Sequence, residues 1–217
     1  MKKIIITIFS SLFLFSVASA EVGINVGVSG SLGAFQATGT ETENDEKNKE
    51  DAVGAAGWAS IFVEKTLGDR IAIGLDYVPS ALESETSERV VTDLGAKAEG
   101  SNSRTNKIKV DFEDLTTLYI TANITENLYA KAGLMQVDVV TKESIGTGSQ
   151  YGDTSLDGTL LGLGYNSTFG NDMFVRVEGN YMSFDSASLT SSTNSDNKVS
   201  VDDLNGVSAK LSIGKSF

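Results

Sequence analysis

The sequence contains no cysteine and no histidine. Without cysteine the chain has neither disulfide bonds nor thiolate chemistry. Without histidine it lacks the commonest general base and the commonest metal ligand. A Ser-His-Asp triad is therefore impossible, and an ordinary zinc site is not expected. These absences disfavour an enzyme, and we expect neither a cofactor nor a bound metal.

Basic residues and proline are also scarce. The chain has 17 Lys and Arg residues against 29 Asp and Glu residues, a formal net charge of −12. No basic stripe could neutralise phosphates, so nucleic acid is not an expected partner. A single proline, 22 glycines and many Thr, Val and Ser residues favour a chain of strands and turns.

Long apolar runs are absent apart from one at the beginning of the chain. Lys2 and Lys3 precede the apolar residues 4–17, and Ala18-Ser19-Ala20 follows. A basic start, a short apolar core and an A-x-A site predict a secretory signal peptide over residues 1–20, with cleavage before Glu21. The alternative is a membrane anchor, but the run is shorter than the roughly 20 residues of a spanning helix. Residues 21–217 then form one domain.

The last stretch of the chain alternates with a period of two. Apolar residues from Val207 to Phe217 share one parity, and Ser, Lys and Gly residues share the other. This is the period of a β-strand. The same alternation predicts eight strands, at about 22–34, 52–66, 71–78, 107–124, 128–141, 161–166, 173–181 and 201–217.

Two of these strands have a less regular pattern. In 52–66 we place Val53 and Ile61 on the apolar face and Trp58 and Glu64 opposite, although both faces carry apolar residues. In 128–141 the apolar parity changes after Leu134. We therefore predict a β-bulge near Met135 that shifts the register.

The connections between the predicted strands alternate between short and long. Tight turns are expected at 67–69, 125–127 and 170–172, and polar loops at 41–51, 80–106, 142–155 and 186–200. In an up-and-down barrel, alternate connections lie at opposite ends. All tight turns then lie at one rim and all polar loops at the other.

The alternation alone does not say which face points outward. A lipocalin-type barrel would enclose the apolar face around a ligand, whereas a membrane barrel turns it toward lipid. The polar face carries charges of both signs in mid-strand, which fits a narrow interior with internal ion pairs. The predicted interior charges are Asp76, Lys109, Glu113, Lys131, Arg176, Glu178 and Lys210. Apolar segments of about 9–11 residues also match the reach of a tilted strand across a bilayer.

These features resemble the small eight-stranded OmpA/OmpX-type outer-membrane β-barrels of Gram-negative bacteria. The resemblance covers essentially all of residues 21–217 and rests on pattern rather than on a long motif. It implies an all-β, antiparallel, up-and-down transmembrane barrel in the outer membrane, with both termini periplasmic and four extracellular loops. We expect no counterpart of the peptidoglycan-binding domain that larger family members carry.

The resemblance also implies partners and an assembly signal. In such barrels a C-terminal aromatic residue, preceded by apolar residues at alternate positions, is read by the barrel-assembly machinery. Leu211, Ile213 and Phe217 match this signal, and Lys215 departs from it. The implied partners are outer-membrane lipid and lipopolysaccharide, with periplasmic chaperones during biogenesis, and the barrel is expected to be a monomer.

The functional hypotheses concern the interior and the loops. Arg176 and Glu178 are the best candidates for a functional pair, as part of a network that gates a small pore. The simpler interpretation is that the charges satisfy one another in a plugged interior. The first hypothesis is thus a non-enzymatic barrel that serves envelope integrity or surface interaction. The alternatives are a small or gated porin and a lipocalin-like periplasmic binder. The acidic loop 41–51 lacks the spacing of a calcium loop.

Aromatic residues near the predicted strand ends are expected to form interfacial girdles. They are Trp58, Tyr77, Phe112, Phe169, Phe174 and Tyr181.

Overall fold

A computed structural model describes residues 23–43, 46–80, 82–83, 87–92, 103–144, 151–193 and 195–217. The predicted signal peptide over residues 1–20 lies outside the described residues and stays a prediction. Within the described part of the chain, no helix is long and apolar enough to cross a membrane.

The described residues form strands joined by turns. The strands are β1 (Ile24–Glu43), β2 (Glu46–Leu67), β3 (Ile71–Tyr77), β4 (Leu82–Glu83), β5 (Ser87–Thr92), β6 (Ser103–Asn123), β7 (Leu128–Ser144), β8 (Thr154–Phe169), β9 (Met173–Phe184), β10 (Ala187–Thr190) and β11 (Lys198–Ser216).

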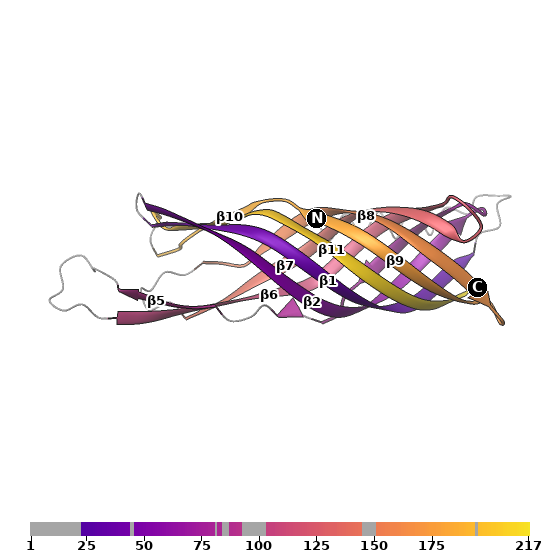
Figure 1. The fold of residues 1–217 in the computed structure, drawn as a ribbon, viewed down its shortest axis with the longest axis horizontal. Coiled ribbons are helices and arrows are strands. Elements are labelled where there is room, and N and C mark those ends of the chain that lie inside the picture. The colour runs from indigo at the N-terminus through magenta and orange to yellow at the C-terminus, as the bar shows by residue number, and fades with distance from the viewer. Residues whose placement is uncertain are drawn as a thin grey trace.

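Eight of these strands form the wall of a closed barrel. Their order is β1-β2-β3-β6-β7-β8-β9-β11, each strand runs antiparallel to its neighbours, and β11 pairs with β1 to close the ring. The strands are strongly tilted, and the barrel is longer than it is wide (Figure 1). The predicted eight-stranded antiparallel up-and-down barrel is confirmed.

The outer face of the wall carries a broad apolar belt. Leu32 and Leu161 are 73% and 62% exposed, whereas Ser31 and Ser29, on the other parity of β1, are buried. The predicted phase of the second strand is confirmed, since Ile61 is exposed and Phe62 and Glu64 are buried. The belt includes Val26, Val28, Leu32, Ile61, Ile120, Leu134, Leu161, Leu163, Tyr165, Val177, Tyr181, Val207, Leu211 and Ile213.

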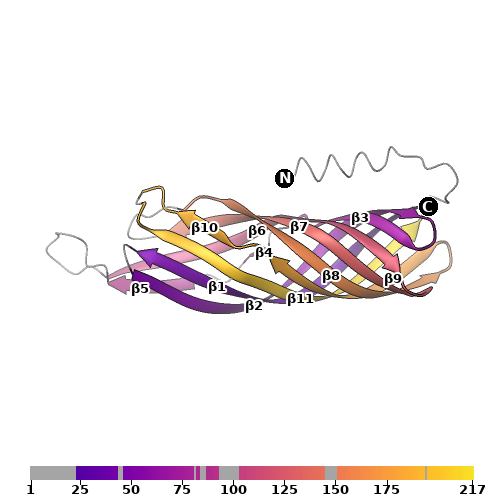
Figure 2. The same ribbon diagram turned by 90° about the horizontal axis from the view of Figure 1, so that it is seen from above.

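All four predicted polar loops contain paired strand residues, which in 142–155 are residues 142–144 and 154–155. β1 and β2 remain in register up to Glu43 and Glu46, so most of 41–51 is a hairpin extension of the wall. β5 pairs with β6, and β10 pairs with β11. Polar side chains do not prevent pairing here, because the backbone hydrogen bonds form whichever side chains the strand carries. Figure 2 shows β5 and β10 projecting beyond the body of the barrel at one end.

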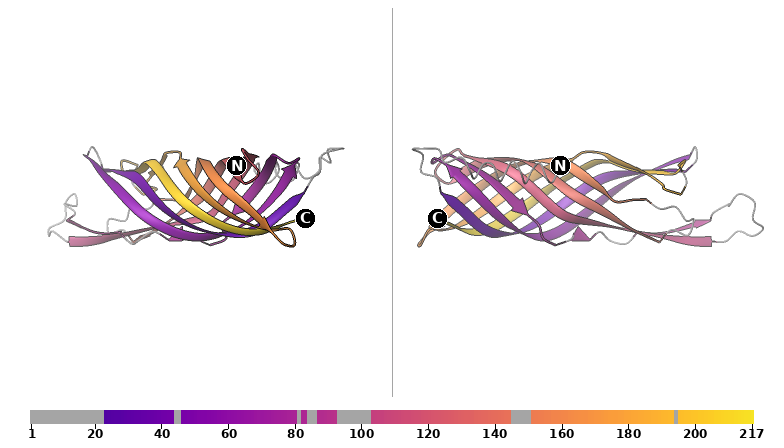
Figure 3. Two further views of the ribbon diagram at one scale, coloured as in Figure 1. Left: turned by 45° about the vertical axis from the view of Figure 1, so that its right-hand side comes forward. Right: turned by 180° about the vertical axis from the view of Figure 1, so that it is seen from behind.

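The opposite rim contains the tight turns and the end of the chain. Phe217 donates its backbone N–H to the Ile24 carbonyl at 2.8 Å and accepts from the Ile24 N–H at 3.1 Å. Ser216 donates to the carbonyl of Asp172 in the turn between β8 and β9. The C-terminus and the beginning of β1 therefore lie together at this turn rim, away from β5 (Figure 3).

Two bulges shift the register near the loop end of the barrel. On β6 the shift falls between Glu113 and Thr116, and Asp114 has a φ of 55°. On β11, Asp202 pairs with Thr38 of β1 and Asn205 pairs with Gln36, so two residues of β11 lie opposite one residue of β1. The first of these two residues, Asp203, has a φ of 54°. Asp tolerates this left-handed conformation better than most residues.

Each bulge turns a leucine into the interior. Leu115 and Leu204, directly after the two aspartates, are both buried in one apolar cluster. The predicted bulge near Met135 is wrong, because β7 pairs without interruption with β8. Met135, Val137 and Val139 all point inward. The apolar parity of the sequence changes here because the interior itself changes from polar to apolar side chains.

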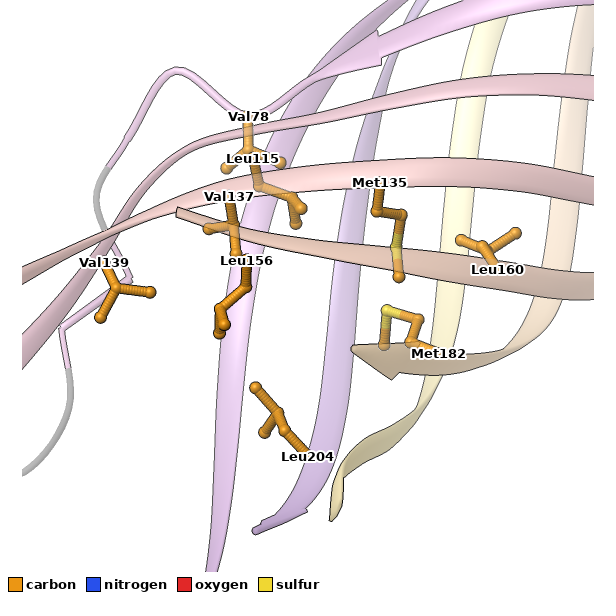
Figure 4. Packing of buried hydrophobic residues seen from close by; sticks show 9 residues of the cluster. All are labelled: Val78, Leu115, Met135, Val137, Val139, Leu156, Leu160, Met182 and Leu204. Atoms are coloured by element: carbon orange, nitrogen blue, oxygen red, sulfur yellow. The ribbon is translucent and has the colours of Figure 1, made fainter. Parts of the chain in front are cut away.

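The interior toward the loop end is thus lined by apolar side chains. Met135, Leu160 and Met182 lie close to one another, and residues from β6, β7, β8 and β11 extend the cluster (Figure 4). We refer to this cluster as the apolar layer. Its buried members are Val78, Leu115, Met135, Val137, Val139, Leu156, Leu160, Met182 and Leu204.

Candidate functional site in the barrel interior

The interior toward the turn rim is charged rather than apolar. It holds three carboxylates and three cations from β2, β3, β7, β9 and β11. We refer to these six residues as the charged layer. They are Glu64, Asp76, Lys131, Arg176, Glu178 and Lys210.

Arg176 and Glu64 form the most extensive contact of this layer. Arg176 donates from Nη1 to Glu64 Oε1 at 2.6 Å and from Nη2 to Glu64 Oε2 at 2.8 Å. Tyr119 and Asn25 also donate to this carboxylate, and Arg176 Nε donates to Asn166 Oδ1. Because β2 and β9 are not neighbours in the ring, this two-bond pair crosses the interior.

Two further ion pairs complete the charged layer. Lys131 Nζ lies 3.2 Å from Glu178 Oε2, and the Tyr129 hydroxyl donates to Glu178 Oε1 at 2.6 Å. Lys210 Nζ contacts Asp76 Oδ2, which also accepts from the Ser60 hydroxyl. β3 and β11 are not neighbours either, so the Lys210–Asp76 pair also crosses the interior.

Aromatic rings and glycines position these charges. The Arg176 guanidinium lies 4.4 Å from the Phe174 ring, and Lys131 Nζ lies 3.9 Å from the Tyr119 ring, both cation–π geometries. Tyr119 and Tyr129 rest on Gly74 and Gly164, where a Cβ atom would collide with the rings. These glycines therefore leave the space in which the tyrosines reach the carboxylates.

Most of the predicted interior charges lie in the interior. Asp76, Lys131, Glu178 and Lys210 are buried, and Arg176 is nearly so, with 12% of its side chain exposed. The structure pairs them differently from the hypothesis, because Arg176 binds Glu64 and Glu178 binds Lys131. Glu64 was absent from the predicted set, although its inward parity on the second strand could have indicated it.

The structure does not place the other two predicted residues, Glu113 and Lys109, in the interior. The placement of Glu113 is wrong: it is directly opposite Asp138 on the outward parity, because the bulge that follows reverses the faces of β6. Phe112 takes the inward position and packs against the apolar layer. The side chain of Lys109 lies outside the described residues.

The predicted aromatic girdle is also only partly correct. Phe169 and Tyr181 are 50% and 49% exposed. Phe174 is buried in the interior, and Trp58 packs against the apolar layer with its ring 5.9 Å from that of Phe35. Large aromatic side chains thus lie in the interior as well as on the outer surface.

The three residues of the predicted assembly signal face outward. Leu211, Ile213 and Phe217 are exposed, as a contact signal requires. Lys215 shares their parity, and its Nζ lies 5.2 Å from the Phe217 ring. Lys215 thus places its charge against the terminal aromatic residue at the turn rim, which is a further cation–π contact.

Two cavities adjoin the charged layer. A cavity of about 130 Å³ lies on its turn-rim side and is lined by Asn25, Arg70, Asn123, Asn166 and Arg176, among others. A smaller cavity of about 30 Å³ lies between the charged and apolar layers. The charged layer and the apolar layer thus occupy successive parts of the interior between the turn rim and the loop end.

Comparisons with known proteins agree on the fold. No protein-family model and no curated protein matches the sequence. The structure is similar to the outer membrane protein OprG from Pseudomonas aeruginosa, with a TM-score of 0.52 and 14% identity over 91% of this chain and 97% of that one. It also matches AlkL, solved in lipid bilayers, with a TM-score of 0.49 and 13% identity over 94% and 93% of the chains.

A third match is Ail of Yersinia pestis, with a TM-score of 0.38 and 15% identity over 88% of this chain and 99% of that one. Of these three matches only OprG has a TM-score above 0.5, and at 14% identity it shows a likeness of fold alone. The chain has the fold of the small outer-membrane β-barrels, as its sequence pattern indicated.

Proposed function

We propose that this protein is a non-enzymatic outer-membrane β-barrel with a closed interior, which acts in envelope integrity or surface interaction through its projecting hairpins. The apolar belt supports the membrane location. From Val207 in β11 to Phe217 just after its end, the chain presents outward apolar residues over about the length of a tilted strand that crosses a bilayer. A lipocalin-like binder would place these side chains around an internal ligand instead.

The observation that supports a closed interior is the Arg176–Glu64 pair. It crosses the barrel with two charge-assisted hydrogen bonds, and the Glu64 side chain has no exposed surface. Separating the pair would leave two charges in a poorly solvated interior, which is costly. The apolar layer occupies the interior toward the loop end with nine buried hydrophobic side chains.

The hairpins at the loop end are the parts that would meet other molecules. Residues 47–51 on β2 are all exposed and carry charges of both signs. We place these hairpins outside the cell and the turn rim in the periplasm. Lipid and lipopolysaccharide would contact the belt, and the barrel-assembly machinery would recognise the outward C-terminal residues.

Membrane fractionation combined with protease treatment of whole cells tests this proposal. The protein should fractionate with the outer membrane, and added protease should cut within 41–51 or 80–106 while the turn rim stays protected. A mature chain that is soluble without detergent would refute the membrane location. Protection of both segments in intact cells, with cleavage after the cells are opened, would refute the orientation.

A small or gated porin is the second candidate. A gated porin is favoured by the ion pairs of the charged layer. Ion pairs can exchange partners and so open a path, whereas a tightly packed apolar plug cannot. The 130 Å³ cavity at the turn rim would be the inner mouth of such a pore. Conductance in planar bilayers separates the candidates, because only a porin should give steps that vanish or change when Arg176 is replaced.

A further inference from the structure

The smaller cavity lies at the boundary between the two layers of the interior. Its volume is about 30 Å³. Lys131, Lys210 and Asp76 line it on the charged side, and Met135, Leu160 and Met182 line it on the apolar side. A cavity needs about 10–15 Å³ to hold one water molecule, so this one has room for one or two.

Two polar atoms at this cavity lack hydrogen-bond partners. Ser31 and Asn180 are 5% and 6% exposed, and both residues line the cavity. Ser31 Oγ and Asn180 Oδ1 are buried, and neither has a hydrogen-bond partner. Such buried atoms are nearly always satisfied in folded proteins, by protein groups or by bound water.

The ammonium groups of the cavity also have hydrogen-bonding capacity left. Each lysine ammonium has three donors. Lys210 donates to Asp76, and Lys131 donates to Glu178. A small ligand here meets donors from the two lysines and from Ser31, and acceptors at Asn180 and Asp76. Water suits both kinds of partner, because it donates and accepts.

We infer that this cavity is a binding site for one or two water molecules, which join Ser31 and Asn180 to the ion pairs of Lys131 and Lys210. The charges around the site favour water over an ion, because each of the two lysines is already paired with a carboxylate. The bound water completes the charged layer where it meets the apolar layer.

A high-resolution structure of the refolded full barrel, with a parallel bromide soak, tests this inference. We expect solvent density within hydrogen-bond distance of Ser31 Oγ or Asn180 Oδ1, and no anomalous bromide signal there. An anomalous peak would replace water by a halide-type anion. A cavity without density would overturn the inference.

Solution measurements and matched variants complete the test. In the full chain, NMR exchange contacts between the Asn180 side-chain amide and long-lived water should be present. They should weaken in Ser31→Ala and stay unchanged in Ser29→Ala, where the deleted hydroxyl bonds Ser212 instead. Equal contacts in all three proteins would contradict a water held by Ser31, and no contacts in the wild type would contradict bound water altogether. Each readout is independent of where the barrel resides in the cell.

Discussion

Arg176 on β9 binds Glu64 on β2 through two hydrogen bonds of 2.6 and 2.8 Å, although 112 residues separate them in the sequence. The pair joins two strands of the wall that do not share a backbone ladder. It therefore stabilises the closed barrel across its interior, in addition to the ladders around its circumference. Paired charges at such depth are stabilising only while both partners are present.

Removal of either partner should destabilise the barrel strongly. We expect Arg176→Met and Glu64→Gln each to lower the free energy of unfolding by about 3–5 kcal/mol, because each leaves a buried charge without its partner. The double variant should lose clearly less than the sum of the two. Urea unfolding of the refolded barrel in lipid vesicles measures these values.

The control for that series is Arg70→Met at the exposed turn rim, which should change stability by no more than about 0.5 kcal/mol. Additive losses in the double variant would contradict a direct interaction between Arg176 and Glu64.

The glycines beneath the interior tyrosines should not tolerate a methyl group. Gly74→Ala would push the Tyr119 ring away from Gly74 and weaken its hydrogen bond to Glu64. We expect a loss of about 1–3 kcal/mol, the usual cost of overpacking. Gly30→Ala is the matched control, since no atom lies within 4 Å of the added Cβ. Equal effects at Gly30 and Gly74 in vesicle unfolding would show that backbone propensity, rather than the ring contact, decides.

The left-handed backbone conformation of Asp203 in the β11 bulge can be tested by substitution. Its φ of 54° suits glycine and disfavours a β-branched residue. Asp203→Gly should therefore be nearly neutral, while Asp203→Val should lower the free energy of unfolding by about 1–2 kcal/mol. Because Asp203 is exposed, packing contributes little to the difference. If both variants have the same stability, the left-handed conformation of Asp203 is wrong.

Period-two alternation predicted the wall of this barrel well. It identified the strand count, the outward belt and the tight turns, because these depend on local side-chain parity. The prediction failed where apolar residues have the inward parity. Val137 and Val139 are apolar and point inward, so the assumption that apolar residues face outward required a bulge that does not exist. Each actual bulge contains the second residue of an acidic pair, Asp114 or Asp203, directly before an inward leucine.

The partners of the charged residues could not be predicted from the sequence. Five of the six charged-layer residues were expected in the interior, but which cation meets which carboxylate depends on the stagger of strands around the ring. Neighbours on one strand, such as Arg176 and Glu178, share a face without binding each other. Glu64 was overlooked because its strand has apolar residues on both faces.

The exposed C-terminal aromatic residue should matter more for assembly in cells than for stability. Phe217 closes the ring through backbone hydrogen bonds that alanine keeps. Phe217→Ala should therefore refold in vitro with nearly wild-type stability, yet accumulate less folded barrel in the outer membrane. Heat-modifiable gel migration of membrane fractions measures the folded amount. Normal assembly of this variant would mean that Phe217 is not part of an assembly signal.

Single-channel recording in planar bilayers tests the closed interior most directly. We predict that the refolded wild-type protein produces no discrete conductance steps. Arg176→Ala should also remain silent, because the apolar layer still closes the half of the barrel toward the loop end. Reproducible steps in the wild type that change size in Arg176→Ala would contradict the account and identify the protein as a pore gated by its charged layer.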